Sequence, residues 1–383
     1  MFRPALPASV AALALIVSAP ALAQVDEAFE TESGFIQVTT VVDGLTNPWA
    51  IEFLPDGGFL VTEREGALRH VSAEGELSEP IAGVPEVDAR DQGGLLDVTI
   101  DPNFAENRMV YLSYAEAGDG GNGTAVARGV LSEDGGTLGE VEVIFQQQPK
   151  VDSTKHFGSR LVFDADGFLF VALGERSDAE FRDQAQDLGS HLGKIVRINP
   201  DGSVPEDNPF VGQDDALPEI YAYGVRNVQA AAIHPESGVL WEIEHGPRGG
   251  DELNIVQPGA NYGWPLVTHG VEYSGDEIGE GVASAEGMID PIHQWTPVIA
   301  PSGMIFYGGE AFSDWQGDLF VGGLASTALV RLEVSEDGVT HEERLLESLG
   351  LRIRDVAEGP DGAIYVATDE SAGEILRIAP AAD

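Results

Sequence analysis

The 383-residue sequence contains no cysteine and few basic residues. Without cysteine the chain can form neither disulfides nor thiolate–metal bonds, so any bound metal must be held by oxygen or imidazole. Only 20 Lys and Arg oppose 65 Asp and Glu, which gives a formal net charge of −45. This charge disfavours nucleic acid and anionic membrane as partners. The carboxylates are spread along the chain, which is typical of a solvated acidic surface, although a few could be ligands of calcium.

Long apolar runs are also missing, except near the start. The segment MFRPALPASVAALALIVSAPALAQ combines Arg3, a short apolar stretch from Val10 to Val17 and the small residues at 21–23. This pattern predicts a secretory signal peptide over residues 1–23, cleaved after Ala23, rather than a transmembrane anchor. We therefore expect a soluble, periplasmic mature protein, residues 24–383, with no insertion into membrane.

The chain has no long segment with helical periodicity, but it has 47 glycines, 22 prolines and many short apolar runs. A unit of strand, Pro/Asp/Gly-type turn and second strand recurs six times. The copies are WAIEFLPDGGFLVTE from Trp49, LLDVTIDPNFAENRMVYLSY from Leu95, SRLVFDADGFLFVALGE from Ser159, QAAAIHPESGVLWEIEHG from Gln229, SGMIFYGGEAFSDWQGDLFVGG from Ser302 and IRDVAEGPDGAIYVATDE from Ile353.

Further strand candidates such as KIVRI and ELNIV follow these copies. Each repeat then has three or four strands, as a propeller blade does. The repeats predict an all-β fold, a six-bladed β-propeller of four-stranded blades, as one domain over residues 24–383. Two β-sandwich domains would also account for the strands, but not for the repeated Asp-Gly hairpin.

Polar residues occupy one phase of this repeat, eight to ten positions before the turn. They are Asn47, Gln92, His156, Asn227 and Arg352. Equivalent positions in radially repeated blades lie on one ring. We therefore expect Gln92, His156, Arg226-Asn227 and Arg352 to converge at one end of the central channel as a binding site. Alone, any one of them could simply cap an inner strand.

The residue types in this ring suggest their chemistry. His156 is the natural general base because the unperturbed pKa of imidazole lies near neutrality. Arg226, Arg352 and Arg354 offer planar forks for carboxylates, which indicates an anionic ligand with several oxygens. The glycine-rich turn between His245-Gly246-Pro247 and Asp251-Glu252 is equally consistent with cation ligands and with an ordinary turn.

The chain resembles the soluble, pyrroloquinoline quinone (PQQ)-dependent aldose sugar dehydrogenases of the glucose/sorbosone dehydrogenase family. The motifs that carry the resemblance are GLTNPWAIEFLPDG, QGGLLDVTIDPNF, HFGSRLVFDADG, YGVRNVQ, EHGPRGGDELN, GANYGWP and LRIRDVAEGPDG. Several such motifs in one order are specific, and they span nearly the whole mature chain.

The resemblance implies PQQ and Ca²⁺ as cofactors, an aldose sugar as substrate and an external electron acceptor. It implies that His156 takes the proton from the sugar C1 hydroxyl while hydride passes to PQQ, which yields a lactone. The implied cofactor contacts are Gln92, His156, Arg226, Asn227, Tyr273, Arg352 and Arg354. The implied metal ligands are the carbonyls of Gly246 and Pro247 for a catalytic Ca²⁺, and Glu252 and Tyr262 for a structural one.

One cation of the family pattern is absent. Where the family commonly has a cofactor-contacting lysine, this chain reads Ala325-Ser326-Thr327. Two other functions stay open on the residues alone: a calcium-centred hydrolase of the lactonase type, and a sugar-binding propeller without catalysis. We expect a monomer or a homodimer.

Overall fold

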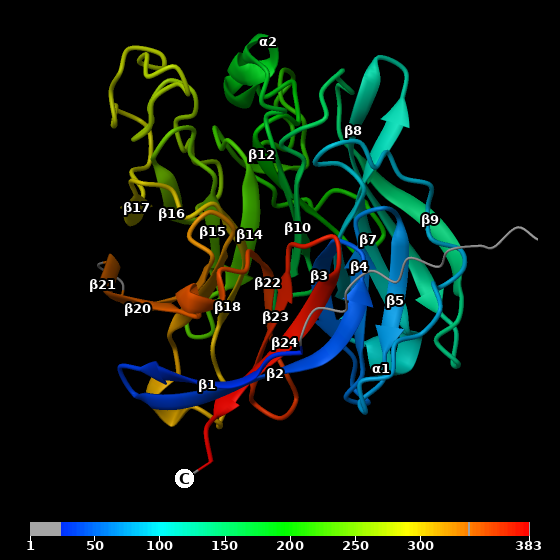
Figure 1. Ribbon diagram of the computed structural model, residues 1–383. Coiled ribbons are helices and arrows are strands. Elements are labelled where there is room, and N and C mark those ends of the chain that lie inside the picture. The colour runs from blue at the N-terminus through cyan, green and yellow to red at the C-terminus, as the bar shows by residue number, and fades with distance from the viewer. Residues whose placement is uncertain (1–23, 336–337, 383) are drawn as a thin grey trace, which may run out of the picture.

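The computed structural model describes residues 24–335 and 338–382, so the predicted signal peptide lies outside the described residues. The described chain forms six antiparallel sheets arranged around an axis (Figure 1). The prediction of a six-bladed β-propeller is thereby confirmed.

Helical segments are few and short. They are α1 (Phe104–Asn107), α2 (Ala179–Arg182), η1 (Asp183–Gln186), η2 (Ser313–Trp315) and η3 (Glu347–Leu349). In the part of the chain that the structure describes, none is long and apolar enough to cross a membrane. In Figure 1, α2 lies at the top of the molecule, whereas β1 and the C-terminus lie at the bottom.

Each blade starts with an inner strand, and the six inner strands match the six repeats of the sequence. They are β3 (Pro48–Phe53), β6 (Leu95–Ile100), β10 (Gly158–Phe163), β14 (Val228–Ile233), β18 (Pro301–Phe306) and β22 (Ile353–Glu358). Each inner strand contacts the inner strand of the next blade, and β22 contacts β3, so the ring is closed.

The remaining strands follow in chain order within each blade. Blade 1 adds β4 (Phe59–Glu63) and β5 (Ala67–Val71); blade 2 adds β7 (Met109–Gly118), β8 (Gly121–Leu131) and β9 (Leu138–Gln146); blade 3 adds β11 (Leu169–Leu173), β12 (Lys194–Ile198) and β13 (Ile220–Tyr223); blade 4 adds β15 (Leu240–Glu244), β16 (Asp251–Ile255) and β17 (His293–Trp295); blade 5 adds β19 (Leu319–Gly323), β20 (Ala328–Ser335) and β21 (Gly338–Leu345).

Blades 1 and 6 depart from the four-stranded pattern. Blade 1 has three strands, supplemented by one bridge from Val71 to Leu77. Blade 6 has five, because β22, β23 (Ile364–Thr368) and β24 (Gly373–Pro380) are extended by β2 (Gly34–Leu45) and β1 (Asp26–Thr31) from the N-terminal part of the chain. The pairing of β2 with β24 joins the two ends of the chain in one sheet and closes the propeller.

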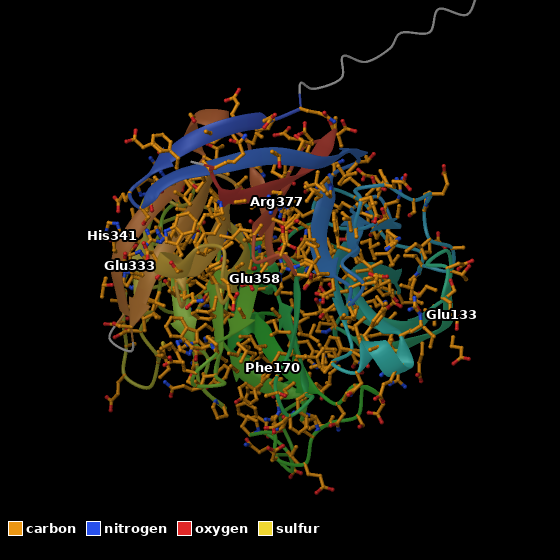
Figure 2. All side chains as sticks on the ribbon, turned by 90° about the horizontal axis from the view of Figure 1, so that it is seen from below. Glu133, Phe170, Glu333, His341, Glu358 and Arg377 are labelled. Atoms are coloured by element: carbon orange, nitrogen blue, oxygen red, sulfur yellow. The ribbon has the colours of Figure 1, made fainter. Side chains whose placement is uncertain are left out.

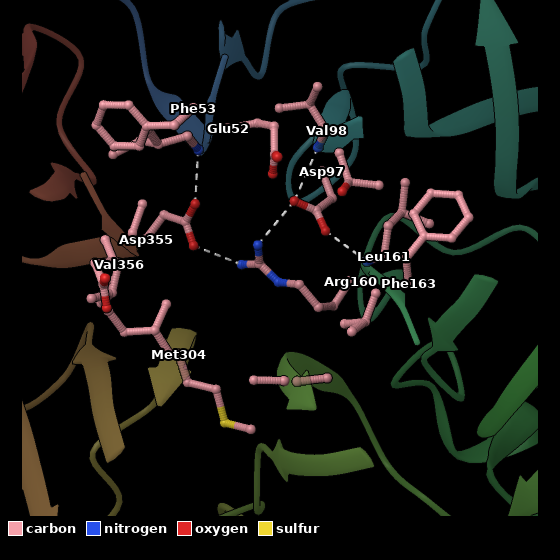
Figure 3. A pocket seen from close by; sticks show the side chains of 18 of the residues that line it. Glu52, Phe53, Asp97, Val98, Arg160, Leu161, Phe163, Met304, Asp355 and Val356 are labelled. Carbon is pink, nitrogen blue, oxygen red and sulfur yellow. Dashed lines mark hydrogen bonds and ion pairs between the residues drawn. The ribbon is translucent and has the colours of Figure 1, made fainter. Parts of the chain in front are cut away.

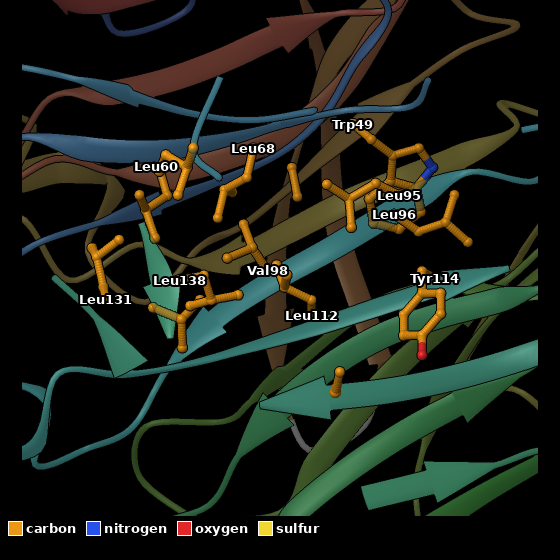
Figure 4. Close-up of a cluster of buried hydrophobic side chains, with 14 of the residues drawn as sticks. Trp49, Leu60, Leu68, Leu95, Leu96, Val98, Leu112, Tyr114, Leu131 and Leu138 are labelled. Atoms are coloured by element: carbon orange, nitrogen blue, oxygen red, sulfur yellow. The ribbon is translucent and has the colours of Figure 1, made fainter. Parts of the chain in front are cut away.

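The hydrophobic core is divided into clusters that fill the interfaces between blades. In the first, Trp49 and Leu60 of blade 1 pack with Leu95, Val98 and Leu112 of blade 2 (Figure 4). Five further clusters occupy the interfaces 2/3, 3/4, 4/5, 5/6 and 6/1. Burial of apolar side chains on both faces of every sheet therefore holds the ring together.

Every inner strand begins with a register shift against its second strand. A β-bulge of this kind redirects side chains and is common beside functional sites. The residues just before three of these strands are also left-handed, with φ of 44° at Asn47, 50° at His156 and 53° at Ala300. The backbone thus departs from regular strand geometry at the start of every inner strand, and at His156 this departure lies at a predicted site residue.

Farther along the inner strands, a cavity of about 390 Å³ lies on the axis. Glu358 lines it and appears near the centre of the ring when the molecule is seen from below, with Glu133 and His341 at the rim (Figure 2). At its inner wall the buried Arg160 guanidinium bonds Asp97 at 2.9 Å and Asp355 at 3.0 Å (Figure 3). This ion cluster joins blades 2, 3 and 6.

Candidate active site

A second cavity, of about 280 Å³, lies at the starts of the inner strands. All the polar residues that line it are Arg64, Gln92, His156, Arg226, Asn227, Gln229, His245, Tyr273, Arg352, Arg354 and Asp369. The predicted ring of Gln92, His156, Arg226-Asn227 and Arg352 is therefore brought together in one place. Asn47 is not among the lining residues, because its side chain turns to Glu65, with Nδ2 donating at 2.7 Å to a carboxylate oxygen.

His156 is buried and held by a carboxylate. Its Nδ1 lies 2.7 Å from Oε2 of Glu175, which follows β11 in the same blade. Burial lowers the pKa of His156 below its ordinary value, Arg226 lowers it further, and Glu175 partly opposes both. A neutral imidazole whose Nδ1–H bonds Glu175 has Nε2 free as a proton acceptor.

The backbone around His156 is fixed by two of the predicted cofactor residues. The His156 amide donates to Oε1 of Gln92 at 2.9 Å, and the Gly158 amide donates to Oδ1 of Asn227 at 3.0 Å. A Cβ at Gly174 would lie 2.0 Å from the His156 carbonyl oxygen, so only glycine permits this close approach. These contacts hold His156 in its left-handed conformation, a form of strain often found at functional sites.

Arg226 turns its guanidinium to the loop after β15. Its Nη1 donates to the carbonyls of His245 and Gly246, each at 2.7 Å. Its Nε lies 4.0 Å from Oε1 of Glu175 and has no hydrogen-bond partner among the described residues, although it is buried. The site therefore holds a buried donor that a ligand could satisfy.

Arg352 and Arg354, at the start of the inner strand of blade 6, share one carboxylate. Nη2 of Arg352 lies 2.6 Å from Oδ2 of Asp369, and Nη2 of Arg354 lies 3.0 Å from Oδ1. Arg354 also donates from Nη1 to Oε1 of Gln229 at 3.1 Å. Two cations on one carboxylate leave this part of the cavity with net positive charge.

Tyr273 and the predicted metal ligands are placed differently. Tyr273 lines the cavity but is 71% exposed, so it stands at the mouth. Gly246 lines the cavity, and its carbonyl retains a second lone pair beside the bond to Arg226. Pro247 is buried and is not among the lining residues.

Glu252 and Tyr262 line a separate small cavity together with Glu244. Burial raises the pKa of Glu252 to about 8 and that of Glu244 well above its ordinary value. The Tyr262 hydroxyl is already engaged, donating to the Ile255 carbonyl at 2.8 Å, so only its main chain is available to a metal. Within residues 24–335 and 338–382, no group of three or more His, Asp or Glu side chains is arranged to hold a metal.

Five polar or aromatic residues that line the cavity were not predicted as site residues: Trp49, Arg64, Gln229, His245 and Asp369. Glu175, the partner of His156, was not predicted either, and it is not among the lining residues. Glu175 and Asp369 each follow the second strand of a blade, so the phase of the inner-strand residues could not reveal them. Glu175 is the second residue after β11 and Asp369 is the first after β23, and this similar position after the second strand of the repeat was the signal that could have found them.

Comparison with known proteins assigns the family. A family model described as Glucose / Sorbosone dehydrogenase matches residues 45–377. The chain belongs to this family. It is 49% identical to the aldose sugar dehydrogenase YliI of Escherichia coli (strain K12) over 351 residues, which cover 90% of this chain and 93% of that protein.

Two solved structures of aldose sugar dehydrogenases extend the likeness. The apo-form of the soluble Escherichia coli enzyme superposes with a TM-score of 0.87 at 48% identity, covering 90% of this chain and 100% of that one. The PQQ-bound form of the Streptomyces coelicolor enzyme gives 0.74 at 29% identity, covering 90% and 98%. The glucose/sorbosone dehydrogenase fold therefore extends over the whole propeller.

The site of the missing family lysine lies at the edge of the cavity. Leu324 lines it, whereas the next residue, Ala325, is exposed and has its amide bonded to the Ile299 carbonyl at 2.9 Å. In this member of the glucose/sorbosone dehydrogenase family, position 325 supplies no charge to the cavity.

Proposed function

We propose that this protein is a PQQ-dependent dehydrogenase that oxidises the C1 hydroxyl of aldose sugars to lactones. The observation that carries the proposal is the buried pair of His156 and Glu175 in a cavity walled by arginines. The names of two relatives, an aldose sugar dehydrogenase and a PQQ-bound one, support it.

The residues present fit PQQ, a flat molecule with three carboxylates. Arg226 offers the buried Nε that lacks a partner among the described residues, and Arg352 and Arg354 offer positive charge from blade 6. Guanidinium groups bind carboxylates in a planar, two-point manner. When bound, PQQ would supply the redox chemistry as the acceptor of the hydride that leaves C1 of the sugar.

His156 supplies the base for this reaction. Its Nε2 takes the proton of the C1 hydroxyl as the C1–H bond is broken, and the lactone carbonyl forms. Because the pKa of His156 is lowered, mainly by burial, the imidazole is neutral and ready to accept a proton near pH 7. Glu175 orients the ring and stabilises the imidazolium that results.

Calcium would be held by carbonyls and by buried carboxylates. The carbonyls of Gly246 and Pro247 would hold a catalytic Ca²⁺, which would supply Lewis acidity in the cavity. Glu252 and the main-chain carbonyl of Tyr262 would bind a structural Ca²⁺, with Glu244 beside them. Two buried carboxylates in one small cavity are a donor set that a hard cation would stabilise.

We propose an exported, periplasmic protein with its signal peptide removed after Ala23, acting as a monomer or homodimer. Electrons would pass from the reduced cofactor to an external acceptor. Nucleic acid and membrane would not be partners.

Reconstitution tests the proposal. Purified apo-protein is supplied with PQQ and Ca²⁺, and dye reduction is followed with a panel of aldoses; we expect reduction only with both cofactors. If PQQ binds but the dye is not reduced, the result would favour a sugar-binding propeller without catalysis, and titration with sugar would test for binding. Lactone hydrolysis with Ca²⁺ alone would indicate the lactonase-type hydrolase instead.

Replacement of the base gives a first prediction. His156→Gln should retain PQQ binding but lose kcat by about a hundredfold or more, because a positioned base contributes about that much. His341→Gln changes an exposed histidine at the rim and serves as the control. Unchanged turnover in His156→Gln would remove His156 from the mechanism.

A further inference from the structure

Arg64 lines the candidate cavity but has no part in the mechanism above. It directly follows β4, and its main chain is fixed at both ends: its amide donates to the Asn47 carbonyl at 3.1 Å, and its carbonyl accepts from the Leu95 amide at 3.0 Å. A Cβ at Gly94 would lie 1.9 Å from the Arg64 carbonyl oxygen, which explains glycine there. The side chain therefore projects from a rigid point between blades 1 and 2.

The guanidinium of Arg64 differs from the other three in the cavity. Arg226 bonds the carbonyls of His245 and Gly246, whereas Arg352 and Arg354 bond Asp369. For Arg64, residues 24–335 and 338–382 provide neither a hydrogen-bond acceptor nor an ion-pair partner to the side chain. An unpaired guanidinium is notable in a molecule with 65 carboxylate residues.

Arg64 also stands close to cations of like charge. Burial lowers the pKa of Arg354, and the positive charges of Arg352 and Arg64 lower it further, while Asp369 opposes them. The three guanidiniums thus lie on one side of the cavity with one shared carboxylate. Like charges in a partly enclosed space repel, so an anion bound between them is stabilised.

We propose that Arg64 is a carboxylate-binding residue of this site, which forms an anion-binding wall with Arg352 and Arg354. Arg64 adds positive charge to a cavity that receives none from position 325. The inference rests on the proposed function for its ligand, a carboxylate of PQQ. It adds a binding residue that neither the repeat phase nor the family motifs indicated.

The test compares PQQ affinity in four proteins: wild type, Arg64→Gln, Arg64→Lys and Arg90→Gln. Arg90 is the matched control, because it pairs with Asp88 outside the cavity. Affinity is measured by equilibrium titration of apo-protein, following tryptophan fluorescence, since Trp49 lines the cavity. Loss of one charged hydrogen-bond pair should raise Kd roughly ten- to hundredfold in Arg64→Gln, less in Arg64→Lys, and not in Arg90→Gln.

The Tm of apo Arg64→Gln separates a lost ligand contact from a folding defect, because a folding defect would lower the Tm. Removing an unpaired cation from beside Arg354 should leave the Tm of the apo-protein unchanged or raise it. If Arg64→Gln binds PQQ as tightly as wild type, the inference is wrong and the proposed function stands. If wild type does not bind PQQ, the proposed function fails, and the tricarboxylate citrate becomes the probe: a Tm rise in wild type that Arg64→Gln loses supports the inference, and any other result overturns it.

Discussion

At the residue scale, the polar side chains of the cavity act on one another before they act on any ligand. Gln92 and Asn227 were predicted as cofactor contacts, and each accepts a backbone N–H beside His156 through its carbonyl oxygen. Their NH₂ groups remain as donors. The sequence predicted these positions because they repeat in phase. That phase does not include Glu175, which follows β11 and reaches His156 through the pairing of β11 with β10.

Glu175 carries the prediction at this scale. Glu175→Gln removes the anion that opposes the lowering of the His156 pKa, so the acid limb of the kcat/KM profile should move to lower pH. The ring also loses its orienting carboxylate, so kcat should fall about tenfold or more while PQQ affinity is kept. Glu219→Gln alters the comparable buried pair with His191, 2.8 Å apart and outside the cavity, and should do neither. An unshifted profile in Glu175→Gln would argue for a purely structural carboxylate.

At the element scale, the bulges at the starts of the inner strands explain why the repeat predicted so much of the site. The bulge recurs at the same point of each repeat. Residues at the same distance from the turn in the sequence therefore lie at the same end of the propeller, one per blade. The three-stranded blade 1 and five-stranded blade 6 were not foreseen. Their strands depend on β2 pairing with β24, a contact between chain ends that no local pattern encodes.

The inner strands of blades 2, 3 and 6 also meet at Arg160, so its removal should destabilise the ring. Arg160→Met leaves Asp97 and Asp355 buried without their shared cation, so it should cost about 3–5 kcal/mol of unfolding free energy. Urea unfolding measures this loss. Arg377→Met breaks the exposed pair with Asp361 in blade 6 and should cost about 1 kcal/mol or less. Equal losses in the two variants would mean that the central cluster does not join the blades.

At the scale of the whole molecule, the exposed acidic side chains and the buried carboxylates affect stability in different ways. Most of the acidic side chains in residues 24–335 and 338–382 are exposed or half-buried, and salt screens exposed charges within about 10 Å at 0.1 M. Glu52 and Asp97 instead line the axial cavity, and burial raises the pKa of Glu52 to about 8 and that of Asp97 to about 7. Salt should therefore weaken the contribution of the exposed carboxylates to stability and leave that of Glu52 and Asp97 unchanged.

This separation predicts how stability depends on pH. A carboxyl whose pKa is raised in the folded state binds more protons there than in the unfolded chain, so its contribution is lost as pH rises from about 4 to above 8. In 1 M salt at fixed calcium, the urea midpoint of wild type should therefore fall between pH 5.5 and pH 8.5. Glu52→Gln imitates the protonated form, so its midpoint should fall less and exceed that of wild type at pH 8.5. Glu133→Gln, an exposed change at the rim, should follow wild type, and a Glu52→Gln curve with the same slope would place the pH dependence elsewhere.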